Sequence, residues 1–163
     1  IGYGELGSSV AKAAAGLGLD IKISERPGIK PRADRVAFEE LLATSDYISL
    51  HCPLTENNKH LINADTLMLM KPTAFLINTA RGGLVDSPAL LSALRDGRIA
   101  GAAIDVLDVE PAASDEPLIT SLQNLLVTPH NAWGAIESRT RLVAQMKENI
   151  EGFLQGLPLR VVN

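Results

Sequence analysis

The hexapeptide GYGELG, residues 2–7, points most directly to the architecture, because its G-x-G-x-x-G spacing is typical of a turn that joins a strand to a helix. In such a turn the first glycine (Gly2) makes the bend, the second (Gly4) lets backbone approach a pyrophosphate, and the third (Gly7) allows close helix–strand packing. The start of the helix adds free N–H groups and the positive end of its dipole. Since glycine-rich turns are common, the remainder of the chain has to support this interpretation.

A carboxylate follows the second predicted strand. Glu25 lies 18 residues after Gly7, directly behind the apolar segment 18–24, where an acid can accept hydrogen bonds from the hydroxyls of an adenosine ribose. The next residue, Arg26, could instead attract a ribose 2′-phosphate. Because Glu25 occupies the position nearest to the ribose, we expect NAD rather than NADP as the cofactor.

Strand and helix signals alternate along the whole chain. Apolar runs predict strands at residues 18–24, 46–52, 73–78, 99–106 and 124–128. Helical patterns cover residues 10–17, 38–43, 64–71, 88–96 and 136–153. Asn63 and Ser87 are the expected N-caps of the third and fourth helices. This alternation predicts an α/β fold, a Rossmann-type doubly wound parallel sheet with helices on both faces.

Polar or titratable residues follow four of these strands at the point where each strand ends. They are His51-Cys52-Pro53, Thr79-Ala80-Arg81, Asp105 and Thr128-Pro129-His130. In parallel α/β sheets ligands bind outside the carboxyl ends of the strands, so we expect these residues to share one binding rim. For His51 and Cys52 we prefer a structural role, with the neighbouring backbone touching the cofactor, and Asp105 could simply cap a turn.

Three side chains could carry chemistry. Arg81 directly follows the apolar run 74–77, and it is either a solvated strand end or a bidentate ligand for a carboxylate. A lone histidine is more often structural than catalytic, but His130 suits proton transfer near neutral pH. Glu110, in the DVEP segment, could orient that histidine from another loop.

The composition limits the possible classes of function. The chain has 163 residues, 46% of them hydrophobic and 21% charged, which is the balance of a folded globular domain. A net charge of −4 without a basic block gives no reason to expect nucleic acid or an anionic membrane as a partner. The single cysteine cannot form an internal disulfide, so we expect a reducing compartment, the cytoplasm. No apolar run approaches transmembrane length, and we expect no metal site.

Five motifs together resemble the D-isomer-specific 2-hydroxyacid dehydrogenase family. They are GYGELG, HCPLT, NTARGGLVD, GAAIDVLDVEP and TPHNAWG, in the order and at the spacings of that family, over essentially the whole chain. The segments ISERPG, HCPLT and HNAWG look most similar to the bacterial glycerate dehydrogenase (hydroxypyruvate reductase) branch. The resemblance implies an NAD-dependent oxidoreductase that transfers hydride between nicotinamide and a small D-2-hydroxy acid or 2-oxo acid, with glycerate and hydroxypyruvate as the expected pair.

The resemblance also implies roles for individual residues. Arg81 would grip the carboxylate and carbonyl of the substrate, while Glu110 and His130 would form the acid/base pair. Asp105 would hold the nicotinamide carboxamide, and the two glycines at 82–83 would keep side chains away from the nicotinamide ribose. The implied cofactor-binding residues are Gly2, Gly4, Glu5, Leu6, Gly7, Glu25, Cys52, Pro53, Thr79, Ala80, Arg81, Asp105, His130 and Gly134.

Full chains of this family are about twice as long and have a substrate-binding half before the glycine turn. We therefore expect residues 1–163 to be an NAD-binding (Rossmann) domain, a fragment without the start of its first strand and without that upstream half. The family also implies a homodimer. Phosphoglycerate or D-lactate dehydrogenases remain open alternatives, as does an NAD-sensing corepressor that binds a protein partner. Formate dehydrogenases are disfavoured because they carry glutamine where Glu110 stands.

Overall fold

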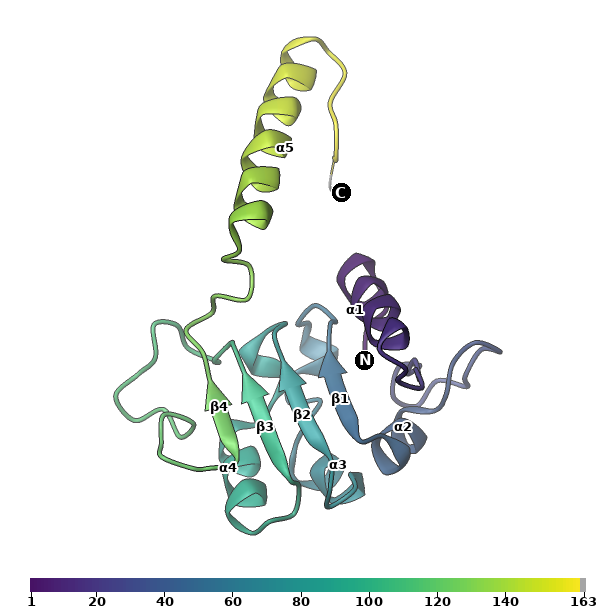
Figure 1. The fold of residues 1–163 in the computed structure, drawn as a ribbon, viewed down its shortest axis with the longest axis vertical. Coiled ribbons are helices and arrows are strands. Elements are labelled where there is room, and N and C mark those ends of the chain that lie inside the picture. Colours follow the sequence, from purple (N-terminus) through teal and green to yellow (C-terminus); the bar gives the residue numbers. More distant parts are fainter. Residues whose placement is uncertain (162–163) are drawn as a thin grey trace. The chain divides into compact units, whose positions relative to one another are not determined.

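Four short parallel strands form a sheet in the order β1-β2-β3-β4 (Figure 1). The strands are β1 (Tyr47–Leu50), β2 (Phe75–Asn78), β3 (Gly101–Ile104) and β4 (Leu125–Val127). In the register of the sheet, Phe75 lies opposite both Tyr47 and Gly101, and Leu125 lies opposite Ala102. Each of these strands falls inside a predicted strand, and the parallel order confirms the Rossmann-type α/β fold.

The computed structural model describes residues 1–161, so the last two residues of the predicted domain 1–163 lie outside the described residues. The described chain divides into two units. Unit 1 is Ile1–Pro129 and contains the sheet, whereas unit 2 begins at His130 and contains the final helix.

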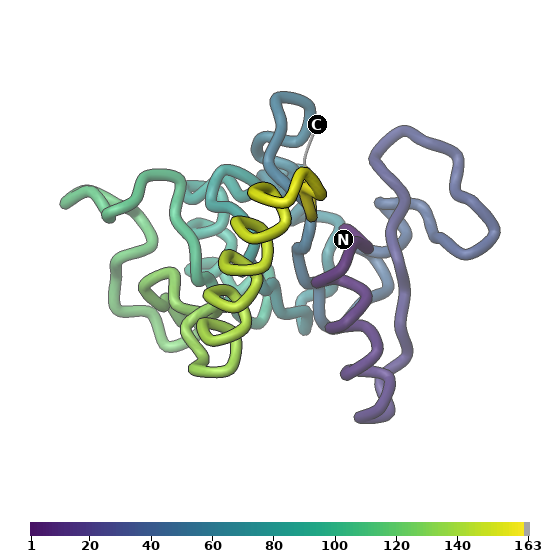
Figure 2. Tube along the Cα trace, turned by 90° about the horizontal axis from the view of Figure 1, so that it is seen from above, coloured from purple at the N-terminus to yellow at the C-terminus, as the bar shows by residue number. Residues whose placement is uncertain are grey.

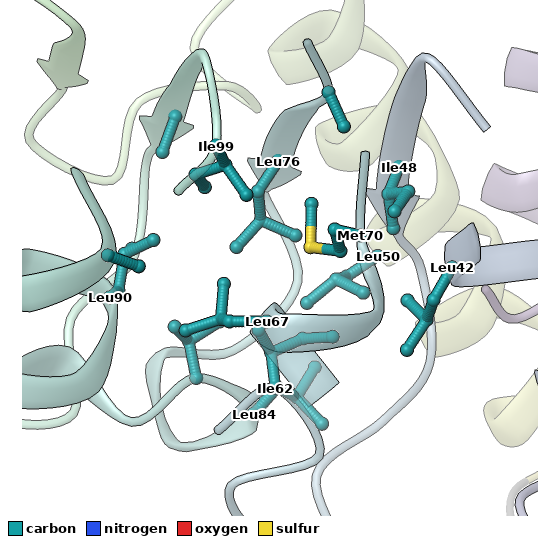
Figure 3. Packing of buried hydrophobic residues seen from close by; sticks show 14 of the residues in the cluster. Leu42, Ile48, Leu50, Ile62, Leu67, Met70, Leu76, Leu84, Leu90 and Ile99 are labelled. Atoms are coloured by element: carbon teal, nitrogen blue, oxygen red, sulfur yellow. The ribbon is translucent and has the colours of Figure 1, made fainter. Parts of the chain in front are cut away.

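One face of the sheet, which carries Ile48, Leu50 and Leu76, packs against three helices. These are α2 (Phe38–Thr44), α3 (Ala64–Leu69) and α4 (Ser87–Arg95). Their apolar side chains join the strands in one buried cluster (Figure 3), which includes Leu42, Ile48, Leu50, Ile62, Leu67, Met70, Leu76, Leu84, Leu90 and Ile99. Full burial of one such side chain stabilises the fold by about 1.5–3 kcal/mol relative to exposure. The cluster therefore supports the strands whose ends carry the candidate site.

Side-chain caps define where α3 and α4 begin. The Asn63 carboxamide oxygen accepts a hydrogen bond from the Thr66 amide at 3.1 Å, and the Thr66 hydroxyl accepts one from the Asn63 amide at 2.8 Å. This reciprocal capping box confirms Asn63 as the N-cap. Ser87 was the wrong residue for α4. Asp86 caps that helix instead, because its carboxylate accepts from the Ala89 amide at 3.1 Å.

The helix α1 (Glu5–Gly16) begins within the GYGELG motif, directly after Gly4, earlier than the helical pattern at residue 10 predicted. Its residues Val10 and Ala14 line one wall of a groove of about 650 Å³, and Ser49 and Ile77 line another. These two sheet residues lie on the face opposite to the one covered by α2, α3 and α4. Helices thus lie toward both faces of the sheet in unit 1, which confirms the doubly wound arrangement; Figure 2 shows α1 in purple to one side of the strands.

The strand predicted at residues 18–24 does not form a ladder, which corrects the sequence-based prediction. Only Ser24, in this segment, makes an isolated parallel bridge. At the edge of β1, the Ile1 backbone nitrogen donates to the Ser49 carbonyl at 2.8 Å, and the Ile1 carbonyl accepts from the His51 amide at 2.7 Å. A strand needs hydrogen-bond partners along its whole length. Residues 19–23 instead line the groove, which lies where a partner strand would run beside them.

Unit 2 contains one long helix, α5 (Ile136–Leu154). The predicted apolar stripe is present, and its members are between 55% and 74% exposed: Ile136, Val143, Met146, Ile150 and Phe153. Helices in proteins gain most of their stability by packing an apolar face, so this stripe is a surface suited to further contact. None of the helices in residues 1–161 is both long and apolar enough to cross a membrane.

Candidate functional site

The glycine turn requires close backbone approach at two of its three glycines. Gly2 has a φ of +89°, and a Cβ there would lie 2.6 Å from the Cys52 amide nitrogen, so only glycine fits. A Cβ on Gly7 would lie 2.2 Å from the Gly2 carbonyl oxygen and 3.3 Å from the His51 Cβ. These two glycines therefore pack the turn and α1 against the end of β1, which confirms the close packing predicted for Gly7 and the need for glycine at the bend made by Gly2.

The second glycine has a different environment. Gly4 is the N-cap of α1, and no side chain of the described residues caps this helix. A Cβ built on Gly4 would have no atom within 4 Å, and Leu6 in the first turn is 73% exposed. The first amides of α1 thus have no side-chain cap, at the positive end of a twelve-residue helix whose first turn is exposed. The backbone of Gly4, Glu5 and Leu6 therefore fits the pyrophosphate of a dinucleotide.

Glu25 is largely buried, with its side chain 9% exposed, and both of its carboxylate oxygens accept hydrogen bonds. Oε2 accepts from Arg32 Nε at 2.8 Å, and Oε1 accepts from the Arg26 amide at 3.2 Å. The hydrogen bond from Arg32, followed by that from Arg26, lowers the pKa of Glu25 below its ordinary value. The expected ribose acceptor is thus a carboxylate that already contacts a guanidinium.

Arg81 lies on a turn that a buried asparagine shapes. Asn78, the last residue of β2, is fully buried; its Nδ2 donates to the Arg81 carbonyl at 2.9 Å, and its Oδ1 accepts from the Ala80 amide at 3.0 Å. Arg81 itself is exposed, as is Thr79, and Arg81 Nη1 donates to the Ala80 carbonyl at 2.6 Å. The backbone is held while the guanidinium is accessible, which suits the binding of an anionic ligand.

The two glycines after Arg81 pack against the loop that follows β3. A Cβ on Gly82 would lie 1.9 Å from the Leu107 carbonyl carbon, and a Cβ on Gly83 would lie 2.9 Å from Asp108 Oδ1. Both glycines are buried at the start of a short 3₁₀ helix, η2 (Gly82–Leu84). The two glycines thus bring the Arg81 turn against the next loop, and the space that we expect them to leave for the nicotinamide ribose stays a prediction.

That next loop carries Asp105 and Glu110. Asp105 is 5% exposed, and its carboxylate accepts a hydrogen bond from the Thr128 hydroxyl, which links the ends of β3 and β4. Glu110 is exposed, and its Oε1 accepts from the Leu107 amide at 2.8 Å. Because Gly82 packs on Leu107, the structure places Arg81 and Glu110 on adjacent loops at the carboxyl ends of β2 and β3.

His51, Cys52 and Pro53 follow β1. His51 Nε2 lies 2.9 Å from Ser49 Oγ, and burial lowers the pKa of this imidazole. Burial raises the pKa of the Cys52 thiol. Pro53 is exposed, and its carbonyl accepts from Asn58 Nδ2 at 2.8 Å. These surroundings favour the structural roles predicted for His51 and Cys52.

His130 and Gly134 belong to unit 2, where they delimit an exposed turn. His130 has a φ of 49°, an uncommon conformation for a residue other than glycine. Its carbonyl accepts from Trp133 Nε1 at 2.8 Å, and the Gly134 amide donates to the Asn131 carbonyl at 2.8 Å. These two hydrogen bonds within the turn contribute to its conformation.

Two residues near the predicted site were not anticipated. Asn78 could have been found, because a polar residue that ends an apolar run and stays buried needs a structural partner. The pairing of Arg32 with Glu25 could not be predicted, because the loop between Glu25 and Arg35 has no periodic pattern. Within residues 1–161, no group of three or more His, Cys, Asp or Glu side chains is arranged to hold a metal ion.

Comparison with known proteins gives consistent matches. Residues 1–132 match the model of the D-isomer specific 2-hydroxyacid dehydrogenase, NAD binding domain. Glycerate dehydrogenase of Methylorubrum extorquens is 47% identical over 163 residues, which cover 99% of this chain and 51% of that protein. Glyoxylate reductase of Korarchaeum cryptofilum is 40% identical over 169 residues, with 100% and 51% coverage. The chain thus spans about half the length of the curated relatives it matches.

A solved structure with similar architecture is an acyclic imino acid reductase in complex with NADPH and D-Arg. It matches with a TM-score of 0.87 at 36% identity, over 99% of this chain and 52% of the other. Sequence motifs, fold and comparisons therefore lead to one assignment: the chain belongs to the D-isomer-specific 2-hydroxyacid dehydrogenase family and contains its NAD-binding domain.

Proposed function

We propose that this chain is the cofactor-binding half of an NAD-dependent oxidoreductase that interconverts a small 2-oxo acid and a D-2-hydroxy acid, with hydroxypyruvate and D-glycerate as the substrate pair. The observation that carries the proposal is the contact between the Arg81 turn and the Glu110 loop in unit 1. Arg81 is exposed on a turn fixed by Asn78 and Gly82, and that turn lies against the loop of Glu110. A cation for a substrate carboxylate and a carboxylate for an acid/base pair thus come from adjacent loops.

The cofactor would lie along the glycine turn and the strand ends. The backbone of Gly4, Glu5 and Leu6 would bind the pyrophosphate, Glu25 the adenosine ribose, and Asp105 the nicotinamide carboxamide. When bound, the nicotinamide supplies or accepts the hydride. Further contacts would come from Gly2, Gly7, Cys52, Pro53, Thr79, Ala80, Arg81, His130 and Gly134. Support comes from the open first turn of α1 and from the family's NAD-binding domain, which the chain matches.

Arg81 would bind the substrate and polarise it. A planar guanidinium matches a 2-oxo acid, because it can donate to the carboxylate and the carbonyl oxygen together. Such an arrangement orients the reacting carbon and stabilises negative charge as it develops on the carbonyl oxygen. Arg81 is suited to this role because its side chain is exposed while its backbone is held by Asn78.

His130 and Glu110 would form the acid/base pair that the family motifs imply. In the reducing direction His130 donates a proton to the substrate oxygen, and the Glu110 carboxylate stabilises the protonated imidazole. Oxidation of the hydroxy acid is the reverse step, in which the same imidazole accepts the proton.

A substrate panel tests the proposed activity. The complete protein would be assayed with NADH and hydroxypyruvate, glyoxylate, pyruvate and phosphohydroxypyruvate, and hydroxypyruvate is expected to give the highest kcat/KM. Glyoxylate is the second candidate, because a glyoxylate reductase is 40% identical to this chain. NADH binding without turnover of any 2-oxo acid would contradict the proposed enzymatic activity and favour a corepressor-like binding protein.

We also propose that the complete protein has a second, substrate-binding half and works as a cytoplasmic homodimer. The relatives' length, the groove beside Ile1 and the exposed stripe of α5 support a larger assembly. Residues 1–163 alone should bind NADH weakly and show no measurable turnover. Without the substrate-binding half as the second wall of the cleft, water screens the charge of Arg81, and nothing positions the 2-oxo acid. A normal enzymatic rate from residues 1–163 alone would contradict the two-half cleft.

A further inference from the structure

The loop after β1 folds around the side chain of one asparagine. Asn58 is the last residue of a short 3₁₀ helix, η1 (Glu56–Asn58), and it is half-buried. Its Nδ2 donates to the Pro53 carbonyl at 2.8 Å and lies 4.0 Å from Cys52 Sγ, while its Oδ1 accepts from the Thr55 amide at 2.7 Å. Because a carbonyl only accepts and an amide N–H only donates, a carboxamide can hold both groups, whereas a carboxylate cannot.

The same loop is joined to the segment that follows Arg81. The Leu54 side chain packs on Gly83, where a Cβ would lie 2.9 Å from Leu54 Cδ2. The His60 amide donates to the Gly83 carbonyl at 2.8 Å. Residues 53–60 therefore contact the chain two residues after Arg81, through a side chain and through the backbone.

Asn58 thus lies between two parts of the proposed site. Pro53 is among the residues proposed to contact the cofactor, and Arg81 is proposed to bind the 2-oxo acid. Residues 53–57 are all exposed, so little burial fixes the conformation of the loop. The two hydrogen bonds of the Asn58 side chain therefore contribute a large share of what holds it.

We propose that Asn58 is a positioning residue, which holds the Pro53 carbonyl and the Arg81 turn in one arrangement so that cofactor and substrate meet preformed loops. The inference rests on the proposed function. Without the donor Nδ2, the Pro53 backbone can turn away from the cofactor, and Leu54 loses its fixed place on Gly83. Each ligand then has to order the loop as it binds, which weakens binding without altering the reacting groups.

Asn58→Ala in the complete protein tests this role. The Kd for NADH, measured by nicotinamide fluorescence, should rise by about threefold to tenfold, the scale of lost hydrogen bonds. At saturating NADH, the KM for the best 2-oxo acid of the substrate panel should rise by a similar factor. The kcat should stay within about twofold of the wild type, because Arg81 reaches the same position once both ligands are bound. A residue that served the fold alone would lower the unfolding midpoint and leave Kd and KM unchanged.

Two further variants separate the hydrogen bonds of Asn58 from its charge. Asn58→Asp keeps an acceptor for the Thr55 amide but cannot donate to Pro53 at neutral pH. It should raise Kd and KM as Asn58→Ala does, and its unfolding midpoint should lie closer to that of the wild type. Asn57, the exposed neighbour of Asn58 in η1, provides the matched control. Asn57→Asp adds the same charge one residue away and should leave Kd and KM at the values of the wild type.

Three results would overturn the inference, and they are distinguishable. Wild-type Kd and KM in Asn58→Ala would show that Asn58 serves the fold alone, while the proposed function stands. Wild-type Kd and KM in Asn58→Asp would show that the hydrogen bond to Pro53 does not position the loop. If the wild-type protein does not bind NADH, the proposed function fails, and the role of Asn58 fails with it.

Discussion

The turns that carry Arg81 and His130 hold two candidate catalytic side chains in very different ways. The Arg81 turn is built on buried groups: Asn78 is fully buried beneath it, and Gly82 packs against Leu107. The His130 turn, in unit 2, is exposed, and Trp133 Nε1 donates a hydrogen bond to the His130 carbonyl within it. The difference teaches that substitutions beneath Arg81 should affect folding and chemistry together, whereas replacement of the exposed His130 side chain should affect chemistry more than stability.

The largest effect on stability should come from Gly82→Ala. A Cβ there would lie 1.9 Å from the Leu107 carbonyl carbon, so the turn and the loop would have to separate. We expect a loss of about 3 kcal/mol in the free energy of unfolding, the upper range for an overpacked core site. Denaturant unfolding measures it, with Gly16→Ala as control, because a Cβ on this helical glycine would have no atom within 4 Å. Equal free energies of unfolding for Gly82→Ala and Gly16→Ala would contradict the close packing of the Arg81 turn on the loop after β3.

His130→Ala should lower the catalytic rate and leave the stability of the fold unchanged. In the complete protein, the rate of 2-oxo acid reduction should fall by about 10²-fold, the scale of a lost general acid. The unfolding midpoint should stay within the error of the wild type, because the side chain is exposed. Steady-state kinetics and thermal unfolding of the same preparation check both parts. An unchanged rate would make His130 a structural residue.

Asn78→Ala should have an intermediate effect, because it should lower the stability of the fold and also weaken substrate binding. The substitution removes the partners of the Arg81 carbonyl and the Ala80 amide, which lie 2.9 Å and 3.0 Å from the Asn78 side chain. The loss of such buried hydrogen bonds costs about 1–3 kcal/mol of stability. The KM for hydroxypyruvate should rise in the same variant, because Arg81 is no longer held in place. Normal kinetics in a destabilised variant would show that Asn78 serves the fold alone.

The sequence predicted what depends on local pattern and on motif spacing. Apolar runs located all four strands of the sheet, and the G-x-G-x-x-G spacing identified Gly2 as the bend and Gly7 as a close-packing position. It failed at segment 18–24, because β-propensity produces a strand only where a neighbour supplies hydrogen bonds. It also could not reveal that Gly82 packs on Leu107 or that Arg32 pairs with Glu25, since both contacts depend on how loops meet in space.

The smallest effect concerns Cys52, which belongs to the packed part of the molecule. Burial raises the pKa of its thiol, so less thiolate is present at neutral pH than in a free cysteine. Alkylation by iodoacetamide should therefore be roughly tenfold slower than for a cysteine in the urea-unfolded chain. Mass spectrometry of timed samples measures the rate. Equal rates in the folded and unfolded chain would show that this edge of β1 opens freely.

The central claim is that Arg81 binds and polarises the 2-oxo acid, and the kinetics of Arg81→Gln in the complete protein test it most directly. The side chain is exposed and only its carbonyl is held by Asn78, so the variant should fold normally. The kcat/KM for hydroxypyruvate should fall by about 100-fold, and Arg81→Lys should recover part of the loss. A kcat/KM equal to that of the wild type would contradict the account.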